Sequence, residues 1–412
     1  MAPGNYSFPR LVEGKIFVNN KFVTPTATAT STLYNGKITD NHIISNWEHA
    51  DAAVAAAREA LAGLWSKFTG LQRAKCLFKF ADLREQNAEE AAYYESICSG
   101  RIIDDHGLAS DRSPVDADIV RHEPIGVCGG ITPWNGPLMV FVMKGAPALA
   151  VGNTVVLKPP EKSPLSSLFA ASLLEKAGFP HGVFNVVTGD GSAGALVSGH
   201  MDSFNSSVEI GRKIAAAANA SSMKRVTLEL GGKSLVIIFP TQTYRLQSLC
   251  VAPSRVYVHE SIVDQLIAGV KKEFERLGST LGLDPQQYGT TFGPVIDKNQ
   301  YERVHKYIEQ AKQDATLPKA SIYQDEIFGP VLYIRRFTDE EEAASVFIED
   351  TKRIFRVTKR LQAGIVGANV LNMLFSNPPF GGYKSSGVGK ELGKYALSDY
   401  SATKPSISSK SI

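Results

Sequence analysis

The sequence predicts an α/β protein built around a doubly wound, mostly parallel sheet that helices cover on both faces. Three observations lead to this prediction: apolar residues recur at helical spacing near the N-terminus, short apolar strands then alternate with helical segments, and a second α/β series begins near Val226. Strands that alternate with helices in this way form βαβ units, whose strands are parallel. At 412 residues, 43% of them hydrophobic, the chain can bury a large core in two or three structural regions.

The predicted N-terminal elements are a hairpin and two helices. Apolar and polar residues alternate from Ile16 to Pro25 around an Asn-Asn pair, which is typical of a small hairpin. Helical periodicity then runs from Asp51 to Phe68 and from about Leu71 to Ile97. Helices therefore precede the main run of strands.

Alternating strands and helices follow. Buried strands are expected at residues 125–133, 153–159 and 181–189, and helices at residues 137–152, 163–178 and 206–220, the first of them interrupted at Pro147. The second series continues through residues 226–232, 234–239 and 254–278 and reaches Ser386. The stretch from Tyr400 to Ile412 is rich in Ser and Lys and is expected either to dock as a strand on a partner or to fray.

Composition and charge exclude several classes of function. Lys and Arg total 44 against 41 Asp and Glu, and the net charge of +3 is spread along the chain, so we expect no nucleic-acid and no membrane partner. Residues Pro124 to Met143 carry no charge, but three prolines and four glycines favour a buried strand, turn and core helix over a membrane span. No phosphate loop, HExxH zinc helix or GxSxG nucleophile elbow is present.

The cysteines and the N-terminus predict a cytoplasmic protein without a metal site. Cys76, Cys98, Cys128 and Cys250 are scattered singly, which is typical of reduced thiols and unlike the paired spacing of zinc or redox motifs. The opening MAPGNYSFPR lacks the basic and apolar regions of a secretory signal, so the mature chain is expected to start near Met1.

Six segments, taken in order, resemble the NAD(P)-dependent aldehyde dehydrogenase family. They are TPWNGPLM (Thr132 to Met139), GNTVVLKPPEKSP (Gly152 to Pro164), LELGGKS (Leu228 to Ser234), CVAPSRVYV (Cys250 to Val258), EIFGPVL (Glu326 to Leu332) and PPFGGYKSSGVGKELGKYAL (Pro378 to Leu397). Each is a modest match alone, and the resemblance covers the chain from about Gly14 to its end.

This resemblance implies a domain organisation and an oligomer. It implies an NAD(P)-binding domain over residues 1–110 and 128–228, a Rossmann-type unit, and an α/β catalytic domain over residues 229–394. Residues 111–127 and 395–412 would form a small β extension for oligomerisation. Family members pair through a β segment that Ala117 to Val127 resembles and through the C-terminal tail, which implies a homodimer or homotetramer.

The family's chemistry needs a nucleophile, an oxyanion donor and a base. By resemblance the nucleophile that makes the aldehyde carbon tetrahedral is Cys250, although Leu249 and Val251 would also suit a buried inert thiol. Asn135 matches the side-chain donor to the oxyanion; its alternative is an ordinary turn residue. Glu229 matches the base that activates water against the thioester; its alternative is an ion pair within an apolar strand.

The resemblance also implies the cofactor contacts. Lys158 and Glu161 resemble the pair at the adenosine ribose, Glu326 the acceptor at the nicotinamide ribose, and Phe328 the ring beside the nicotinamide. The resemblance implies six cofactor-binding residues in all, with Trp134 and Ser207 completing the set: Lys158, Glu161, Glu326, Phe328, Trp134 and Ser207. A Glu at the ribose 2′-hydroxyl repels a 2′-phosphate, so NAD is expected, with NADP possible.

The chain departs from the family by several internal deletions. Only twenty residues separate Glu229 from Cys250, and further shortened joins lie near Arg101, Ser203, Lys319 and Ala344. The family's FTGS turn reads Phe204-Asn205-Ser206-Ser207 here. Two hypotheses therefore stand: an oxidoreductase that converts an aldehyde to a carboxylate, or a catalytically impaired relative with a structural or interaction role.

Overall fold

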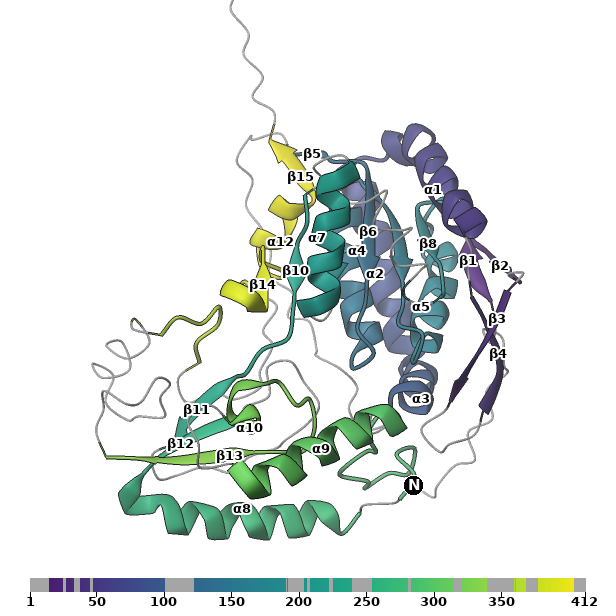
Figure 1. The fold of residues 1–412 in the computed structure, drawn as a ribbon. Coiled ribbons are helices and arrows are strands. Elements are labelled where there is room, and N and C mark those ends of the chain that lie inside the picture. Colours follow the sequence, from purple (N-terminus) through teal and green to yellow (C-terminus); the bar gives the residue numbers. More distant parts are fainter. Residues whose placement is uncertain are drawn as a thin grey trace, which may run out of the picture.

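The structure, a computed structural model, describes residues 15–24, 27–32, 38–44, 47–100, 122–189, 191, 204–205, 208–221, 225–238, 254–280, 283–314, 320–338, 359, 361–367 and 377–403. Figure 1 shows two α/β regions within these residues, one around β6 to β8 and one around β11 to β13. The alternating strands and helices predicted between residues 125 and 220 form the region around β6 to β8. The second predicted series, which begins near Val226, includes the strands of the region around β11 to β13.

The larger sheet has five strands in the order β2-β1-β8-β7-β6. Its strands are β1 (Ile16–Val18), β2 (Lys21–Val23), β6 (Val127–Ile131), β7 (Thr154–Lys158) and β8 (Phe184–Val186). The strands β6, β7 and β8 are mutually parallel, as the βαβ pattern predicts, whereas β1 joins antiparallel. The predicted hairpin is confirmed, because β1 pairs antiparallel with β2. Its two turn residues, Asn19 and Asn20, have positive φ values of 53° and 59°, as a tight hairpin turn requires.

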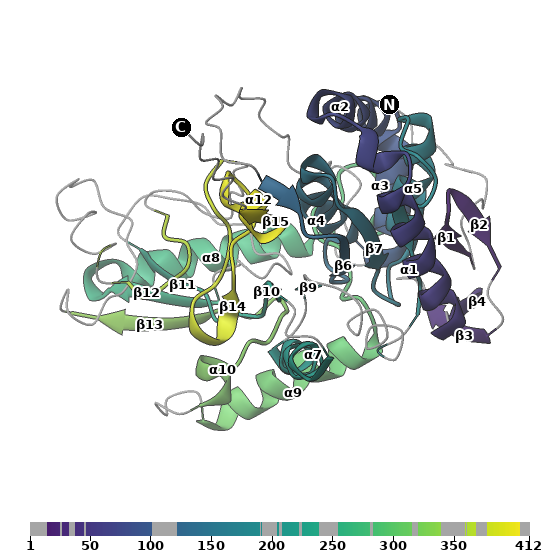
Figure 2. The same cartoon turned by 90° about the horizontal axis from the view of Figure 1, so that it is seen from above.

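Helices cover both faces of this sheet, which confirms the doubly wound prediction (Figures 1 and 2). One face packs against α1 (Trp47–Ala62) and α7 (Val208–Ser221). The other packs against α4 (Pro137–Val151) and α5 (Leu165–Lys176), with α2 (Gly70–Gln86) and α3 (Ala88–Ser99) behind them. The sheet is therefore buried between two helical layers.

Three of the predicted helices differ from those in the structure. The predicted first helix begins earlier, at Trp47, and ends at Ala62; a 3₁₀ turn, η1 (Trp65–Lys67), follows Gly63. The predicted second helix breaks at Asn87, whose side-chain amide donates to the Leu83 carbonyl and competes with the helix backbone. The helix α4 runs through Pro147 without interruption, because its packing between α2, α5 and β7 compensates for one missing N–H donor.

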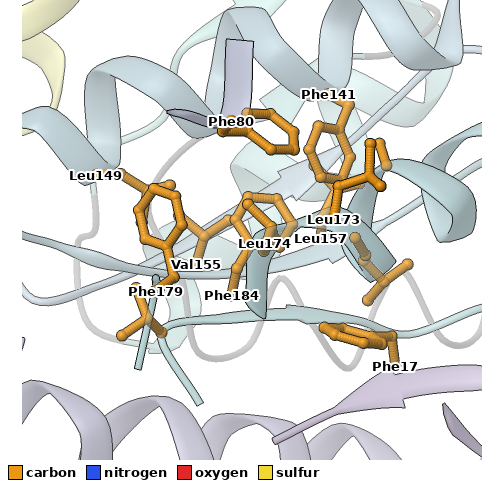
Figure 3. Packing of buried hydrophobic residues seen from close by; sticks show 14 of the residues in the cluster. Phe17, Phe80, Phe141, Leu149, Val155, Leu157, Leu173, Leu174, Phe179 and Phe184 are labelled. Atoms are coloured by element: carbon orange, nitrogen blue, oxygen red, sulfur yellow. The ribbon is translucent and has the colours of Figure 1, made fainter. Parts of the chain in front are cut away.

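The main core lies between the larger sheet and the α4/α5 layer (Figure 3). Phe141 on α4 and Phe184 on β8 pack with ring centroids 4.6 Å apart, and both are about 1% exposed. A Cβ on Gly145 would lie 2.8 Å from the Phe184 ring, so α4 approaches the sheet more closely there than another residue allows. This close packing fixes α4, whose N-terminus supports the polar loops described below.

The C-terminal half forms two small sheets and their helices. A three-stranded sheet has the order β14-β10-β9, and a parallel sheet has the order β11-β12-β13. Their strands are β9 (Phe204–Asn205), β10 (Leu228–Glu229), β14 (Gly387–Val388), β11 (Leu235–Ile238), β12 (Arg255–His259) and β13 (Tyr333–Phe337). The helical elements are η2 (Glu260–Ile262), α8 (Val263–Gly278), α9 (Lys298–Asp314), α10 (Ser321–Gln324), η4 (Lys384–Ser386) and α12 (Tyr395–Asp399).

Two antiparallel strand pairs lie at the periphery. One joins β3 (Ala27–Thr32) to β4 (Ile38–Ile44), and the other joins β5 (His122–Pro124) to β15 (Ser401–Thr403). The second pair joins segments that are far apart in the sequence. Pro124 lies opposite Ser401 and His122 lies opposite Thr403, at sequence separations of 277 and 281 residues. Among the residues that the structure describes, no helix has the length and apolarity needed to cross a bilayer.

The packing of Phe141 generates a stability prediction. Replacing Phe141 by Ala leaves a cavity against Phe184 and Phe80, so the free energy of unfolding should fall by about 3–5 kcal/mol in urea denaturation. The matched control is Phe78→Ala, because Phe78 is 60% exposed on α2 and its loss should cost less than about 1 kcal/mol. Equal losses from the two variants would contradict this account of the core.

Candidate active site

Glu229 ends β10 in the middle of the three-stranded sheet. Its backbone pairs with Asn205 on β9 and with Gly387 on β14. A Cβ on Gly381 would lie 2.7 Å from Glu229 Oε1, so the chain passes closely over this carboxyl group. The Oε1 atom is buried and has no hydrogen-bond partner among the described residues. A buried carboxyl oxygen without a partner is costly and points to a functional role.

The surroundings of Glu229 favour its neutral form. Burial, and after it the nearby Glu391 carboxylate, raise the pKa of Glu229 to about 8, although the Lys144 ammonium opposes the rise. Lys390 opposes the rise as well, and Asp399 adds to it. A carboxyl group with this pKa exchanges its proton near neutral pH, which is the property that a general base requires.

Lys144 and Glu391 form an ion pair beneath this carboxyl group. Their side chains are 2% and 3% exposed, and they join α4 to the segment that precedes α12. We did not predict either residue from the sequence. The signal was present, however, because Lys144 is the only charged residue in the apolar helix PLMVFVMKGAPALAV, and a charge buried there needs a partner.

Lys158 and Glu161 lie at the carboxyl end of β7. Lys158 Nζ is 3.1 Å from Glu161 Oε2, with the lysine side chain 5% exposed and the glutamate side chain 55% exposed. Although burial raises the pKa of Glu161, the Lys158 ammonium more than offsets it, so this pKa lies below its ordinary value. A buried lysine thus holds an accessible, ionised carboxylate, which can accept hydrogen bonds from a hydroxyl-bearing ligand.

Trp134 and Asn135 form the turn between β6 and α4. The Thr132 N–H donates to the Lys158 carbonyl at 3.1 Å, and Ser163 Oγ donates to the Trp134 carbonyl at 2.9 Å. The loops that follow β6 and β7 are therefore tied together at the carboxyl edge of the parallel sheet, where ligands bind in doubly wound folds. Asn135 is half-buried in this turn.

Glu326 and Phe328 lie on the loop between α10 and β13. Glu326 Oε1 accepts a hydrogen bond from the Gly232 N–H at 3.1 Å, so this carboxylate contacts the segment that follows Glu229. Burial raises the pKa of Glu326, although the Gly232 N–H opposes the rise. Phe328 has φ +58°, a left-handed conformation that is rare for a bulky residue. Its ring centroid is 5.2 Å from that of Trp134, edge to face.

The structure brings together many of the predicted site residues. Lys158 contacts Glu161, Trp134 contacts Phe328, and Glu326 contacts the segment after Glu229. The predicted nucleophile Cys250 and the predicted cofactor residue Ser207 lie outside the described residues, as do the shortened joins at Arg101, Ser203, Lys319 and Ala344. Within the described ranges, no group of three or more His, Cys, Asp or Glu side chains could hold a metal ion.

The chain matches a known family along most of its length. The model of the family described as "Aldehyde dehydrogenase family" matches residues 29–113, 107–318 and 314–405. An aldehyde dehydrogenase from Emericella nidulans is 36% identical over 469 residues, which cover 94% of this chain and 94% of that protein. Human aldehyde dehydrogenase 1A1 is 34% identical over 473 residues, which cover 95% and 94%.

Solved structures agree with the sequence matches. The NAD+ complex of an aldehyde dehydrogenase from Bacillus cereus has a TM-score of 0.86 and 32% sequence identity, and the match covers 95% of this chain and 96% of that one. The alignment with the Emericella nidulans protein extends over 469 positions, more than the 412 residues of this chain. An alignment longer than the chain includes positions at which this chain has no residue, which is consistent with the predicted deletions but does not place them.

The buried ion pair generates a stability prediction. Replacing Lys144 by Met leaves the Glu391 carboxylate buried without its cation, so the free energy of unfolding should fall by about 3–5 kcal/mol in urea denaturation. The double variant Lys144→Met/Glu391→Leu buries no charge there and should recover most of that loss. A single variant as stable as the wild-type chain would show that the pair is not buried as described.

Proposed function

Because this chain belongs to the aldehyde dehydrogenase family, we propose that the site residues described above divide among them the oxidation of an aldehyde to a carboxylate. The chain is an NAD(P)+-dependent oxidoreductase. Its nicotinamide cofactor, once bound, accepts the hydride that leaves the aldehyde carbon. The remaining steps fall to residues of the chain itself.

The loops after β6 and β7 fit the cofactor. The Glu161 carboxylate, held by Lys158, accepts hydrogen bonds from ribose hydroxyls and repels a 2′-phosphate, which favours NAD over NADP. Glu326 supplies a second carboxylate for a ribose, and Phe328 with Trp134 supplies an aromatic wall for the nicotinamide. Ser207 completes these contacts. The support for this assignment is that these loops converge at one sheet edge.

Cys250 acts as the nucleophile. Its thiolate attacks the aldehyde carbon and forms a tetrahedral thiohemiacetal, from which the hydride can leave. The side-chain amide of Asn135 donates to the oxyanion that develops during this attack. Loss of the hydride leaves a thioester on the Cys250 sulfur, which must be hydrolysed before the next turnover.

Glu229 acts as the general base for that hydrolysis. Its carboxylate takes a proton from a water molecule, which then attacks the thioester and releases the carboxylate product. The observation that supports the whole assignment is the half-buried Glu229 carboxyl group, which has a pKa of about 8 and one oxygen with no hydrogen-bond partner in the part of the chain that the structure describes. No observation on the described residues favours the alternative of a catalytically impaired relative.

We also propose the organisation of the chain. Residues 1–110 and 128–228 form the NAD(P)-binding domain and residues 229–394 the catalytic domain. Residues 111–127 and 395–412 form an oligomerisation surface of a homodimer or homotetramer, supported by the pairing of β5 with β15. A cytoplasmic location is supported by the buried thiols of Cys76, Cys98 and Cys128.

An enzymatic assay tests the proposed function. The purified chain, mixed with NAD+ and a panel of aliphatic and aromatic aldehydes, should form NADH, which is followed by its absorbance. Cys250→Ala should abolish that signal because the hydride cannot leave without the tetrahedral adduct. Equal rates from the wild-type chain and Cys250→Ala would remove the covalent mechanism.

The raised pKa of Glu229 generates a pH prediction. Only the deprotonated carboxyl group is a base, and its pKa is raised to about 8, so kcat limited by thioester hydrolysis should rise with pH through about 8. Glu229→Gln should lower kcat by about 10²–10⁴-fold and remove this dependence.

A second variant tests the electrostatic origin of the raised pKa of Glu229. Glu391→Gln removes a carboxylate that raises the pKa of Glu229, so the midpoint of the pH profile should move to lower pH. A midpoint that stays in place, or that moves upward, would contradict the electrostatic origin of the shift.

A further inference from the structure

Asp297 forms an ion pair with Lys162 that bridges the two halves of the proposed cofactor site. Lys162 follows Glu161 on the loop after β7, whereas Asp297 directly precedes α9 in the second α/β region. Their side chains are 37% and 22% exposed, so the pair lies at the surface of the molecule. We call the loop after β7, which carries Glu161 and Lys162, the ribose loop, and the loop that carries Glu326 and Phe328 the nicotinamide loop. The ion pair joins the ribose loop to α9, the helix that contacts the nicotinamide loop.

The same aspartate also orders the first turn of α9. Its Oδ1 atom accepts a hydrogen bond from the Gln300 N–H at 2.8 Å, which caps the helix N-terminus. Although burial raises the pKa of Asp297, the Lys162 ammonium and the N–H groups of Gln300 and Asn299 more than offset it, so this pKa lies below its ordinary value. The carboxylate is therefore ionised at neutral pH and engaged on both oxygens.

Gln300 links the first turn of α9 to the nicotinamide loop by hydrogen bonds. Its Nε2 atom donates to the Ile327 carbonyl at 3.1 Å and to the Phe328 carbonyl at 2.8 Å. These two bonds hold the backbone on which Phe328 adopts φ +58° and packs edge to face on Trp134. Trp134 is in turn tied by Ser163 to the loop that carries Lys162, which closes a ring of contacts around the site.

The segment before Asp297 is firmly seated. A Cβ on Gly293 would lie 2.0 Å from the Gly100 carbonyl oxygen, and a Cβ on Gly100 would lie 3.2 Å from Pro294. The chain there packs directly against the end of α3, in the first region. The backbone at Asp297 is therefore held in place by packing, and its ion pair with Lys162 positions the loop that carries Lys162.

We propose that Asp297 is a positioning residue that sets the ribose loop and the nicotinamide loop in register, through Lys162 on one oxygen and Gln300 on the other. This role rests on the proposed function, because it assumes that Glu161 and Phe328 contact the same cofactor molecule. A helix cap alone needs only one acceptor oxygen, which a serine supplies as well. The second oxygen and the cation opposite it are what the positioning role adds.

The test compares the affinity of the full chain for NAD+ among matched variants, by titration calorimetry. Asp297→Ser keeps the cap and loses the ion pair, and Lys162→Gln removes the pair from the other side. Each should raise the Kd for NAD+ by about three- to five-fold, as expected for a partly exposed pair. The double variant should bind NAD+ with about the same Kd as the weaker-binding single variant, because the two residues act through one contact.

Three controls separate positioning from folding. Lys162→Arg keeps the charge and should retain near wild-type affinity. Lys298→Gln removes the neighbouring, exposed partner of Glu302 and should leave the Kd for NAD+ unchanged. Asp297→Ser should melt near the wild-type temperature without NAD+, and its kcat at saturating NAD+ should fall by a smaller factor than its affinity.

Each outcome decides the proposal. Single variants with wild-type affinity, or a double variant whose loss is the product of the two single losses, would overturn the positioning role while leaving the proposed function intact. A wild-type chain that binds no NAD+ would overturn the proposed function and this inference with it.

Discussion

The buried ion pair between Lys144 and Glu391 is the interaction on which the arrangement of the proposed active site depends. Because both side chains are almost inaccessible, neither charge can be buried without the other. The pair holds the C-terminal segment against α4, and that segment supplies β14, which pairs with β10 at Glu229. The same segment carries Gly381 over the Glu229 carboxyl group. Through this contact α4, Glu229 and the C-terminal segment are held together.

The site combines tight backbone packing with a few long polar links. Gly145 and Gly293 allow elements to approach where any side chain would collide. Across these close contacts, Asn153 donates to the Ala148 and Tyr400 carbonyls and accepts from the Gly126 N–H, which ties β7 to α4 and to the C-terminus. Such satisfied buried networks restrict the elements to one relative position, which is what keeps reacting groups in register.

The sequence allowed the βαβ core to be predicted because its signal is local. Short buried apolar strands and helical segments alternate between residues 125 and 189, and each pattern is complete within its own segment. The break at Asn87 and the continuity at Pro147 were missed, because side-chain competition and tertiary packing decide them. Lys158, Glu161, Glu326 and Phe328 could be proposed as site residues because sequence motifs carry them. Glu391 and Asp297 were missed, because their partners lie 247 and 135 residues away in sequence.

The central claim is that this packing holds the Glu229 carboxyl group neutral at neutral pH and lets it ionise near pH 8. The most direct measurement is the infrared difference spectrum between the wild-type chain and Glu229→Gln, recorded from about pH 6 to about pH 10. We expect a carboxylic-acid carbonyl band that is present at the lower pH and disappears with a midpoint near 8. The absence of that band throughout, or a midpoint near the ordinary glutamate value of about 4.3, would contradict the account.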